Sequence, residues 1–254
     1  MSDFNRNFAT AARSAGADRA AVIDAGLRAY MLRVYNYMAA GVGLTGVVAW
    51  FTYQAAVVTN AAGQITGLTP FGHAIYGGPM MLVLVLGTFG LVMFIQFRIQ
   101  HLQPATALTL FMVYAGAFGL MLSSVFLTYT GASLTRVFFI SAASFGALSL
   151  YGYTTQRDLS PIGSFLVMGL FGVMIAMLVN IFLKSTGLDF VISVLGVLVF
   201  AGLTAWDTQR IKEMYSTMDD GTVAGRKAVM GALRLYLDFI NLFLFLLRFL
   251  GDRR

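Results

Sequence analysis

Residues 105–133, ATALTLFMVYAGAFGLMLSSVFLTYTGAS, contain no charged side chain in 29 consecutive positions. About 20 apolar residues in an α-helix cross the roughly 30 Å hydrocarbon core of a bilayer. An apolar run of about 18 residues or more indicates a transmembrane helix rather than a helix of a soluble core. This stretch therefore predicts a helix that crosses a membrane.

Working outward from this stretch, six more runs of the same kind appear along the chain. The expected spans cover about residues 34–58, 77–97, 105–130, 134–156, 162–184, 189–207 and 228–250. The runs are continuous, whereas strands of a membrane barrel need only about 9–11 alternating residues, so helices are expected. The fold class is an all-α integral membrane protein with seven transmembrane helices. They form a domain at residues 30–254, after a polar N-terminal segment at residues 1–29 that has no cleavable signal peptide.

The composition excludes several other classes of protein. Of the 254 residues, 58% are hydrophobic and only 11% are charged, whereas a soluble domain carries about 25% charged residues. A soluble enzyme and a disordered chain are both excluded on this ground. The chain has no Cys, which excludes disulfides, thiol catalysis and Cys-bound metals, and its two His leave little room for a transition-metal site. No cofactor is expected.

The net charge of +6 is interpreted as membrane topology, not as affinity for nucleic acid. Basic residues concentrate on the cytoplasmic side of a membrane protein. With seven spans, one side holds Arg6, Arg13, Arg19, Arg28, Arg33, Arg98, Arg157, Arg210, Lys212, Arg226, Lys227 and Arg234. The other side holds Arg136, Lys184, Arg248, Arg253 and Arg254. The N-terminus is therefore predicted to be cytoplasmic. A re-entrant last segment, which would bring the C-terminal charges inside, is the alternative.

Ionisable residues inside a bilayer are costly and tend to be functional. Asp238 lies about ten residues into the last span, which is about 15 Å deep at 1.5 Å per residue. Steps of 4, 3 and 7 residues place four polar residues of this span on one face: Arg234, Asp238, Asn241 and Arg248. A polar stripe should face the interior of the bundle, so we expect this helix to be central.

Asp207 ends the sixth span, and two interpretations of it stay open. It is either a boundary acid, solvated or paired with Arg210, or the partner of Asp238 across the sixth and seventh helices. Two adjacent carboxylates cannot both ionise cheaply, so the pair would share a proton and respond to pH. When deprotonated, the pair would attract a hard cation such as Ca²⁺, which makes both acids candidate transient calcium ligands.

The polar positions of the last spans are embedded in motifs that resemble the Bax inhibitor family, the transmembrane Bax-inhibitor-motif group that includes the bacterial YccA-like proteins. The likeness covers about residues 28–251. It rests on LYLDFINLF at 235–243, LRFLG at 247–251, AWDTQRIK at 205–212, FF at 138–139, SFGA at 144–147 and YGY at 151–153.

This resemblance implies a fold, a location and a function. It implies a multi-pass protein of the bacterial inner membrane, with the seventh helix surrounded by the other six. It implies a pH-sensitive calcium leak governed by aspartates that match Asp207 and Asp238, with Arg98 at the position of an arginine latch. Eukaryotic members suppress cell death, and YccA-like members modulate the membrane protease FtsH. The alternative function is therefore a non-conducting protein that regulates such a protease or a stress response.

The sequence departs from the family pattern in two ways. Arg234 lies one turn before Asp238, at a position that is not basic in the family, and the second span has no acid. Arg234 and Arg248 are accordingly possible charge partners of the aspartates. Enzyme activity is not expected: an aspartyl protease would need Gly-x-Gly-Asp at Asp238, and a retinal protein would need a lysine in the last span.

Overall fold

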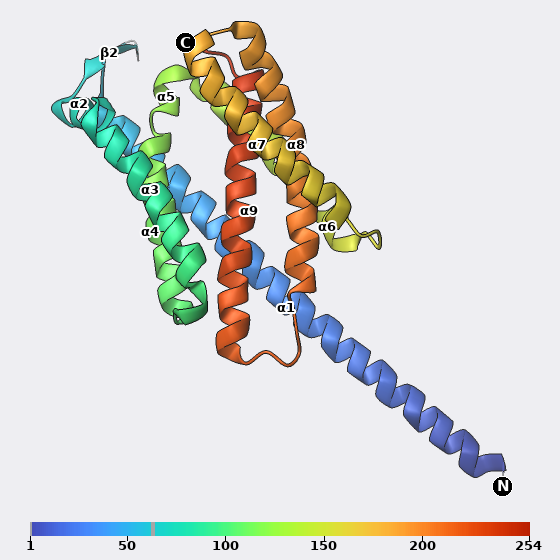
Figure 1. Cartoon of the computed structure of the whole chain (residues 1–254). Helices are drawn as coiled ribbons and strands as arrows, with labels where there is room; N and C mark the ends of the chain where they lie inside the picture. The colour runs from blue at the N-terminus through green and yellow to red at the C-terminus, as the bar shows by residue number, and fades with distance from the viewer. Residues whose placement is uncertain (1, 62–63) are drawn as a thin grey trace.

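A computed structural model describes residues 2–61 and 64–254, and this part of the chain contains seven helices long and apolar enough to cross a membrane (Figure 1). They are α1 (Ser2–Ala56), α3 (Pro79–Arg98), α4 (Pro104–Leu122), α6 (Gly131–Thr154), α7 (Ser160–Leu183), α8 (Thr186–Glu213) and α9 (Gly221–Leu250). The shorter elements are β1 (Val57–Thr59), β2 (Ile65–Leu68), α2 (Pro70–Tyr76), the 3₁₀-helix η1 (Ile99–His101) and α5 (Val125–Thr128). The predicted all-α membrane fold with seven spans is confirmed.

The last helix, α9, forms the centre of the bundle, as predicted from its polar stripe. In its most apolar stretch 72% of the residues are buried inside the protein, against 6% in α7. Its main neighbours are α8, α1, α6 and α4, whereas α3 packs on α4 and α7 packs on α8. The expectation that all six other helices surround it directly is therefore too simple, because α3 and α7 form an outer layer.

Small residues allow the helices around α9 to approach closely. A Cβ atom placed on Gly152 of α6 would lie 2.1 Å from the backbone oxygen of Ala205 in α8. A Cβ on Gly119 of α4 would lie 2.7 Å from the backbone oxygen of Thr45 in α1. Without a hydrophobic driving force between helices in lipid, such close backbone contact is a main source of association. Gly119 and Gly152 therefore serve helix packing, whereas a Cβ on Gly43 or Gly46 would meet nothing within 4 Å.

One of the predicted boundaries differs from the structure because of local hydrogen bonds. The third span, expected at 105–130, is broken between α4 and α5, where the Ser123 and Ser124 hydroxyls donate to the Leu120 and Met121 carbonyls at 2.5 and 2.9 Å. Hydroxyls that bond to the backbone in this way compete with the helical ladder. Between the first and second expected spans, the chain forms the β1–β2 hairpin and α2.

The N-terminal helix continues through the boundary predicted at residue 29. α1 runs unbroken from Ser2 to Ala56, and its N-terminal part extends beyond the bundle on the side of the α8–α9 connection (Figure 1). The part of α1 that qualifies as a span begins at Ile23. The polar segment and the first span are therefore one continuous helix.

Basic side chains close the helices at the end of the bundle that carries the α8–α9 connection. Arg226 Nε and Nη1 donate to the Leu102 and Gln100 carbonyls, both at 2.7 Å. Lys212 Nζ donates to the Tyr153 carbonyl at 2.8 Å, and Lys227 Nζ to the Met214 carbonyl at 2.9 Å. The last carbonyls of a helix lack intrahelical partners and carry partial negative charge, so cations there are stabilising. These basic residues thus cap the chain reversals at this end.

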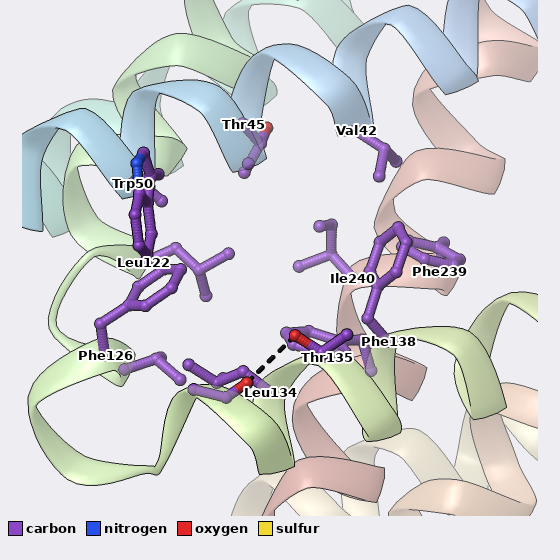
Figure 2. A pocket seen from close by; sticks show the side chains of 15 residues that line it. Val42, Thr45, Trp50, Leu122, Phe126, Leu134, Thr135, Phe138, Phe239 and Ile240 are labelled. Carbon is purple, nitrogen blue, oxygen red and sulfur yellow. Dashed lines mark hydrogen bonds between the residues drawn. The ribbon is translucent and has the colours of Figure 1, made fainter.

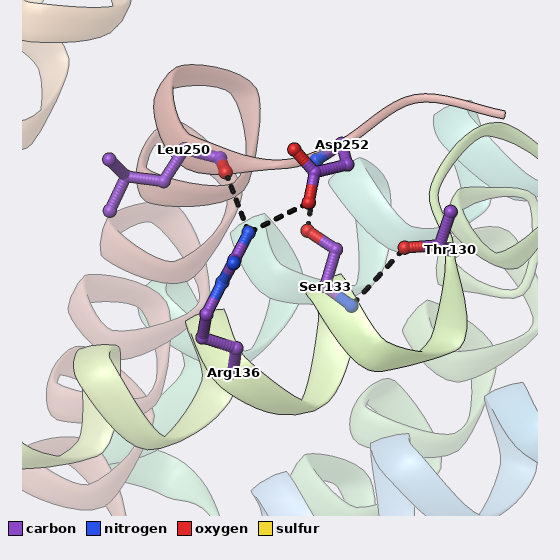
Figure 3. A network of polar contacts seen from close by, with 5 residues as sticks. All are labelled: Thr130, Ser133, Arg136, Leu250 and Asp252. Carbon is purple, nitrogen blue, oxygen red and sulfur yellow. Dashed lines mark hydrogen bonds and ion pairs between the residues drawn. The ribbon is translucent and has the colours of Figure 1, made fainter.

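The C-terminal segment is fixed at the opposite end of the bundle (Figure 3). Arg136 Nη2 lies 2.8 Å from Asp252 Oδ2, and the Asp252 backbone N–H donates to Ser133 Oγ at 2.9 Å. The segment also pairs with the residues before α6, through a bridge between Tyr129 and Arg253. The helix α9 is continuous over 30 residues and runs from one end of the bundle to the other. It therefore crosses the bundle and is not re-entrant.

Candidate functional site

The carboxyl group of Asp238 lies deep inside the bundle. The residue is 5% exposed, and it sits on the central helix about 25 Å from the start of α9 and about 18 Å from its end. Its Oδ2 atom is buried and receives no hydrogen bond from any residue that the structure describes. A buried carboxylate without partners is expensive, so the surroundings of Asp238 decide its state.

Asp207 is brought to Asp238 from the neighbouring helix. It lies six residues before the end of α8, the helix that packs most extensively on α9. Its side chain is 14% exposed, and its carboxyl group lies next to the Asp238 carboxyl. Two adjacent carboxyl groups cannot both ionise cheaply. Of the two interpretations of Asp207 left open by the sequence, the structure has the one in which the acids meet.

Arg234 provides the positive charge next to this pair. Its Nη1 atom lies 3.6 Å from Asp207 Oδ1, and its side chain is 40% exposed. Arg210, the other basic candidate for Asp207, instead lies over the Trp206 ring at 5.1 Å from the ring centroid. Arg234 therefore places a positive charge beside the two acids. We call Asp207, Asp238 and Arg234 the aspartate cluster.

The other predicted site residues do not join the aspartate cluster. Asn241 Nδ2 donates to the Leu237 carbonyl of its own helix at 2.8 Å. Arg248 forms an ion pair with Asp189 at the C-terminal end of the bundle. Arg98, at the end of α3, is exposed and has no ion pair with the side chains that the structure describes, those of residues 23–61 and 64–254. The latch role of Arg98, which the family resemblance implies, stays a prediction.

A chain of hydroxyl groups beside the aspartate cluster was not predicted from the sequence. The Tyr35 hydroxyl lies 2.7 Å from Ser149 Oγ, which lies 2.9 Å from Thr208 Oγ1, so the chain joins α1, α6 and α8. Thr208 in turn donates to the Thr204 carbonyl at 2.7 Å. The position of Thr208 next to Asp207 was the one available signal. This chain fixes the rotation of α8, and so the direction in which Asp207 points.

Gln209 has a structural role in the same motif. Its side-chain amide accepts from the Leu159 N–H at 2.9 Å and donates to the Arg157 carbonyl at 2.8 Å. It therefore holds the α6–α7 connection against α8. In that connection the Ser160 backbone N–H donates to Asp158 at 2.8 Å, and this hydrogen bond lowers the pKa of the exposed Asp158 carboxyl. The WDTQ motif thus combines one residue of the aspartate cluster with two that position its helix.

Tyr236 anchors the part of α9 next to Asp238. Its buried hydroxyl lies 2.7 Å from Thr45 Oγ1, and Thr45 is 2.9 Å from the Ala115 carbonyl. The Tyr236 ring also meets Phe111 of α4 edge-on, with ring centroids 5.4 Å apart. These contacts join α9 to α1 and α4, opposite the side on which α8 supplies Asp207. Asp238 is thereby held between two anchored faces of the bundle.

An apolar pocket of about 440 Å³ near Thr45 is a poor candidate for a cation site (Figure 2). Val42 and Trp50 from α1 face Phe138 from α6 and Ile240 from α9 across it. Its lining contains no ionisable side chain. A cation needs oxygen ligands, so the aspartate cluster remains the better candidate.

The aspartate cluster fits a passing cation better than a resident metal. Within the residues that the structure describes, no group of three or more His, Asp or Glu side chains converges as metal ligands would. Ca²⁺ takes six to eight oxygen ligands, whereas the cluster contains only two carboxyl groups, those of Asp207 and Asp238. A cation held there would keep much of its water, which suits transient contact.

The sequence is similar to a known protein family and to several bacterial proteins. Residues 27–254 match the family described as inhibitor of apoptosis-promoting Bax1. An uncharacterised protein of Rickettsia prowazekii is 46% identical over 254 residues, which is 100% of both chains. The inner membrane protein YbhL of Escherichia coli is 43% identical over 232 residues, covering 91% of this chain and 94% of YbhL.

Proposed function

This chain belongs to the Bax inhibitor family of membrane proteins, and from that premise we propose that it is a pH-sensitive cation leak with calcium as its cargo. Asp207 and Asp238 are the groups that bind both protons and the passing cation. The observation that carries this proposal is the meeting of two carboxyl groups, that of Asp238 being buried, between α8 and α9.

The proton makes the aspartate cluster responsive to pH. With one proton shared, Arg234 balances the remaining charge and the cluster is neutral. When that proton leaves, two carboxylates face a single guanidinium, and the excess negative charge attracts a cation. Protons and Ca²⁺ therefore compete for the same oxygens. Calcium binding should release protons, and it should strengthen as the pH rises through the range in which the pair titrates.

The orientation of the protein in the membrane follows from the distribution of its basic residues. The end of the bundle with the α8–α9 connection carries twelve of the 17 basic residues, if the N-terminal arginines are counted with it. By the positive-inside rule this end is cytoplasmic, and the C-terminal segment faces the other side. YbhL is named an inner membrane protein, which supports the inner membrane as the location.

Flux through liposomes tests this proposal. The purified protein is reconstituted in liposomes that contain a calcium-sensitive dye, and influx is followed at several external pH values. We expect influx above that of empty liposomes, with a rate that changes with pH. Equal influx in protein-containing and empty liposomes at every pH would contradict the proposal.

A non-conducting regulator of a membrane protease such as FtsH is the second candidate. The observation that favours it is the N-terminal part of α1, which extends beyond the bundle and offers a surface outside the membrane domain (Figure 1). Cross-linking and co-purification with FtsH, before and after removal of residues 2–22, separate the two functions. Co-purification that depends on this segment, together with absent flux, favours the regulator. Flux without co-purification favours the leak.

A further inference from the structure

A polar cavity of about 560 Å³ lies at the C-terminal end of the bundle, far along α9 from the aspartate cluster. Four segments distant in sequence line it: the region of Val125 and Tyr129, the α7–α8 connection, the end of α9 and the C-terminal segment. Its charged lining residues are Lys184, Asp189, Arg248 and Arg253. Because three of these lining side chains are cationic, we call it the cation cavity.

The cation cavity has an excess of positive charge. Asp189 pairs with Arg248 and lies 3.7 Å from Arg253 Nη2, so its single negative charge is shared between two guanidinium groups. Lys184 has no ion pair within the part of the chain that the structure describes. Three cations against one acid leave a net charge of about +2. Such a cavity is complementary to an anion, and phosphate is one of the anions that arginine and lysine bind well.

An apolar groove of about 470 Å³ continues from the cation cavity. Asn180 and Arg248 line both spaces, so the two are contiguous. The remaining lining of the groove comes from one face of α7, at steps of 3, 4 and 7 residues: Met174, Met177, Leu178 and Ile181. This stripe is about 10 Å long, and it belongs to the helix that is least buried inside the protein. It therefore faces the hydrocarbon of the bilayer.

We propose that the cation cavity and the α7 groove together bind an anionic phospholipid of the leaflet that surrounds the C-terminal end. The phosphate headgroup lies among Lys184, Arg248 and Arg253, and an acyl chain lies along Met177 and Leu178. A free phosphate would use the cavity but not the groove. A zwitterionic lipid would use the groove but gain less from the excess charge.

Three properties of the site favour this occupant over others. The chain spans a membrane, so the groove is in contact with acyl chains at all times. The polar and apolar parts meet at Arg248, whose long side chain can follow the groove while its guanidinium stays in the cavity. The charge excess selects headgroups with a net negative charge. This site is separate from the aspartate cluster and does not depend on ion conduction.

Lipid binding to the purified protein tests this inference. The delipidated protein in a neutral detergent is titrated with phosphatidylglycerol, with phosphatidylcholine or with inorganic phosphate, and bound ligand is counted by native mass spectrometry. The variant Lys184→Gln/Arg253→Gln removes two cations while leaving the Asp189–Arg248 pair intact. Near a membrane surface each Lys or Arg contributes about fivefold in affinity for anionic lipid, so the double variant should bind phosphatidylglycerol about 25-fold more weakly.

Two further variants complete the test. Arg157→Gln is the control: Arg157 is exposed in the α6–α7 connection at the opposite end of the bundle and lines neither space, so phosphatidylglycerol affinity should not change. Leu178→Gln places a polar group in the groove at an exposed position, and it should weaken phosphatidylglycerol binding. Thermal unfolding confirms that each variant is folded.

The outcomes separate the possible occupants. Preference for phosphatidylglycerol over phosphatidylcholine, lost in the double variant and reduced in Leu178→Gln, supports the proposal. Equal binding of the two lipids, or an unchanged double variant, would overturn it. Tight binding of inorganic phosphate with no effect of Leu178→Gln would show a free-anion site and would also overturn it.

Discussion

The ion pair between Arg234 and Asp207 places the positive charge of the aspartate cluster beside its two acids. If Arg234 balances the charge of the two acids, the substitution Arg234→Gln leaves that charge uncompensated inside the bundle. The variant should then be destabilised, and Asp207→Asn should relieve part of the loss. A double-mutant cycle measures this coupling.

The distance sets the size of the effect. Opposite charges 3.6 Å apart attract by about 5 kcal/mol at an effective dielectric constant near 20. The Arg234 side chain is 40% exposed, so water screens the pair well below this value. Because Asp207 is 14% exposed, the pair is nevertheless stronger than a surface pair of up to about 1 kcal/mol. We expect a coupling free energy of about 2 kcal/mol.

Thermal unfolding in a mild detergent measures the cycle. For a domain of this size, 1 kcal/mol corresponds to about 2–4 °C in Tm, so Arg234→Gln should lower Tm by about 4–8 °C. Arg33→Gln is the control, since Arg33 is exposed on α1 and has no ion pair within the described residues. An Arg234→Gln variant with the Tm of the wild type, and a coupling near zero, would refute the assignment of Arg234 as the counter-charge.

Three further predictions concern packing, anchoring and the latch. Gly152→Ala places a Cβ against a backbone carbonyl of α8 and should lower the free energy of unfolding by about 1–3 kcal/mol. Its control is Gly146→Ala, whose Cβ meets nothing within 4 Å and which should be neutral or stabilising by up to about 1 kcal/mol. Tyr236→Phe removes the hydroxyl bonded to Thr45 and should lower the free energy of unfolding by about 1 kcal/mol; no change in Tm would show that this bond does not anchor α9. Arg98→Gln tests the latch role: if Arg98 is the latch, the pH profile of calcium flux in liposomes should shift, and a wild-type profile would remove Arg98 from the mechanism.

The fold was predictable because charge is so rare in this sequence. Most spans show directly as runs with few or no charges, and the fourth carries only Arg136. α9 was expected at the centre because it is the span with an interior acid and a polar stripe. The break between α4 and α5 was not visible, since Ser123 and Ser124 are compatible with a helix until their hydroxyls bond to the backbone. The β1–β2 hairpin is too short to produce a clear alternating pattern.

The aspartate cluster was predictable in its residues but not in its pairings. Helix spacing places Arg234, Asp238 and Arg248 on one face of α9, but it says nothing about the neighbouring helix. Arg248 lies about 15 Å along α9 from Asp238, and there it meets Asp189 of α8. Arg234 lies close enough to Asp207 to balance the negative charge of its carboxylate. Which cation meets which acid depends on the register of α8 against α9, and that register is a property of the packed bundle.

The pH profile of calcium flux through the Asp238→Asn variant tests the central claim most directly. The variant keeps the size and shape of the side chain but removes its ability to bind and release a proton, and Asp252→Asn is the control, because Asp252 is an exposed acid of the C-terminal segment. The account predicts that calcium flux through Asp238→Asn is lost or no longer changes with pH, while Asp252→Asn follows the wild type. A pH profile of Asp238→Asn identical to that of the wild type would contradict the account.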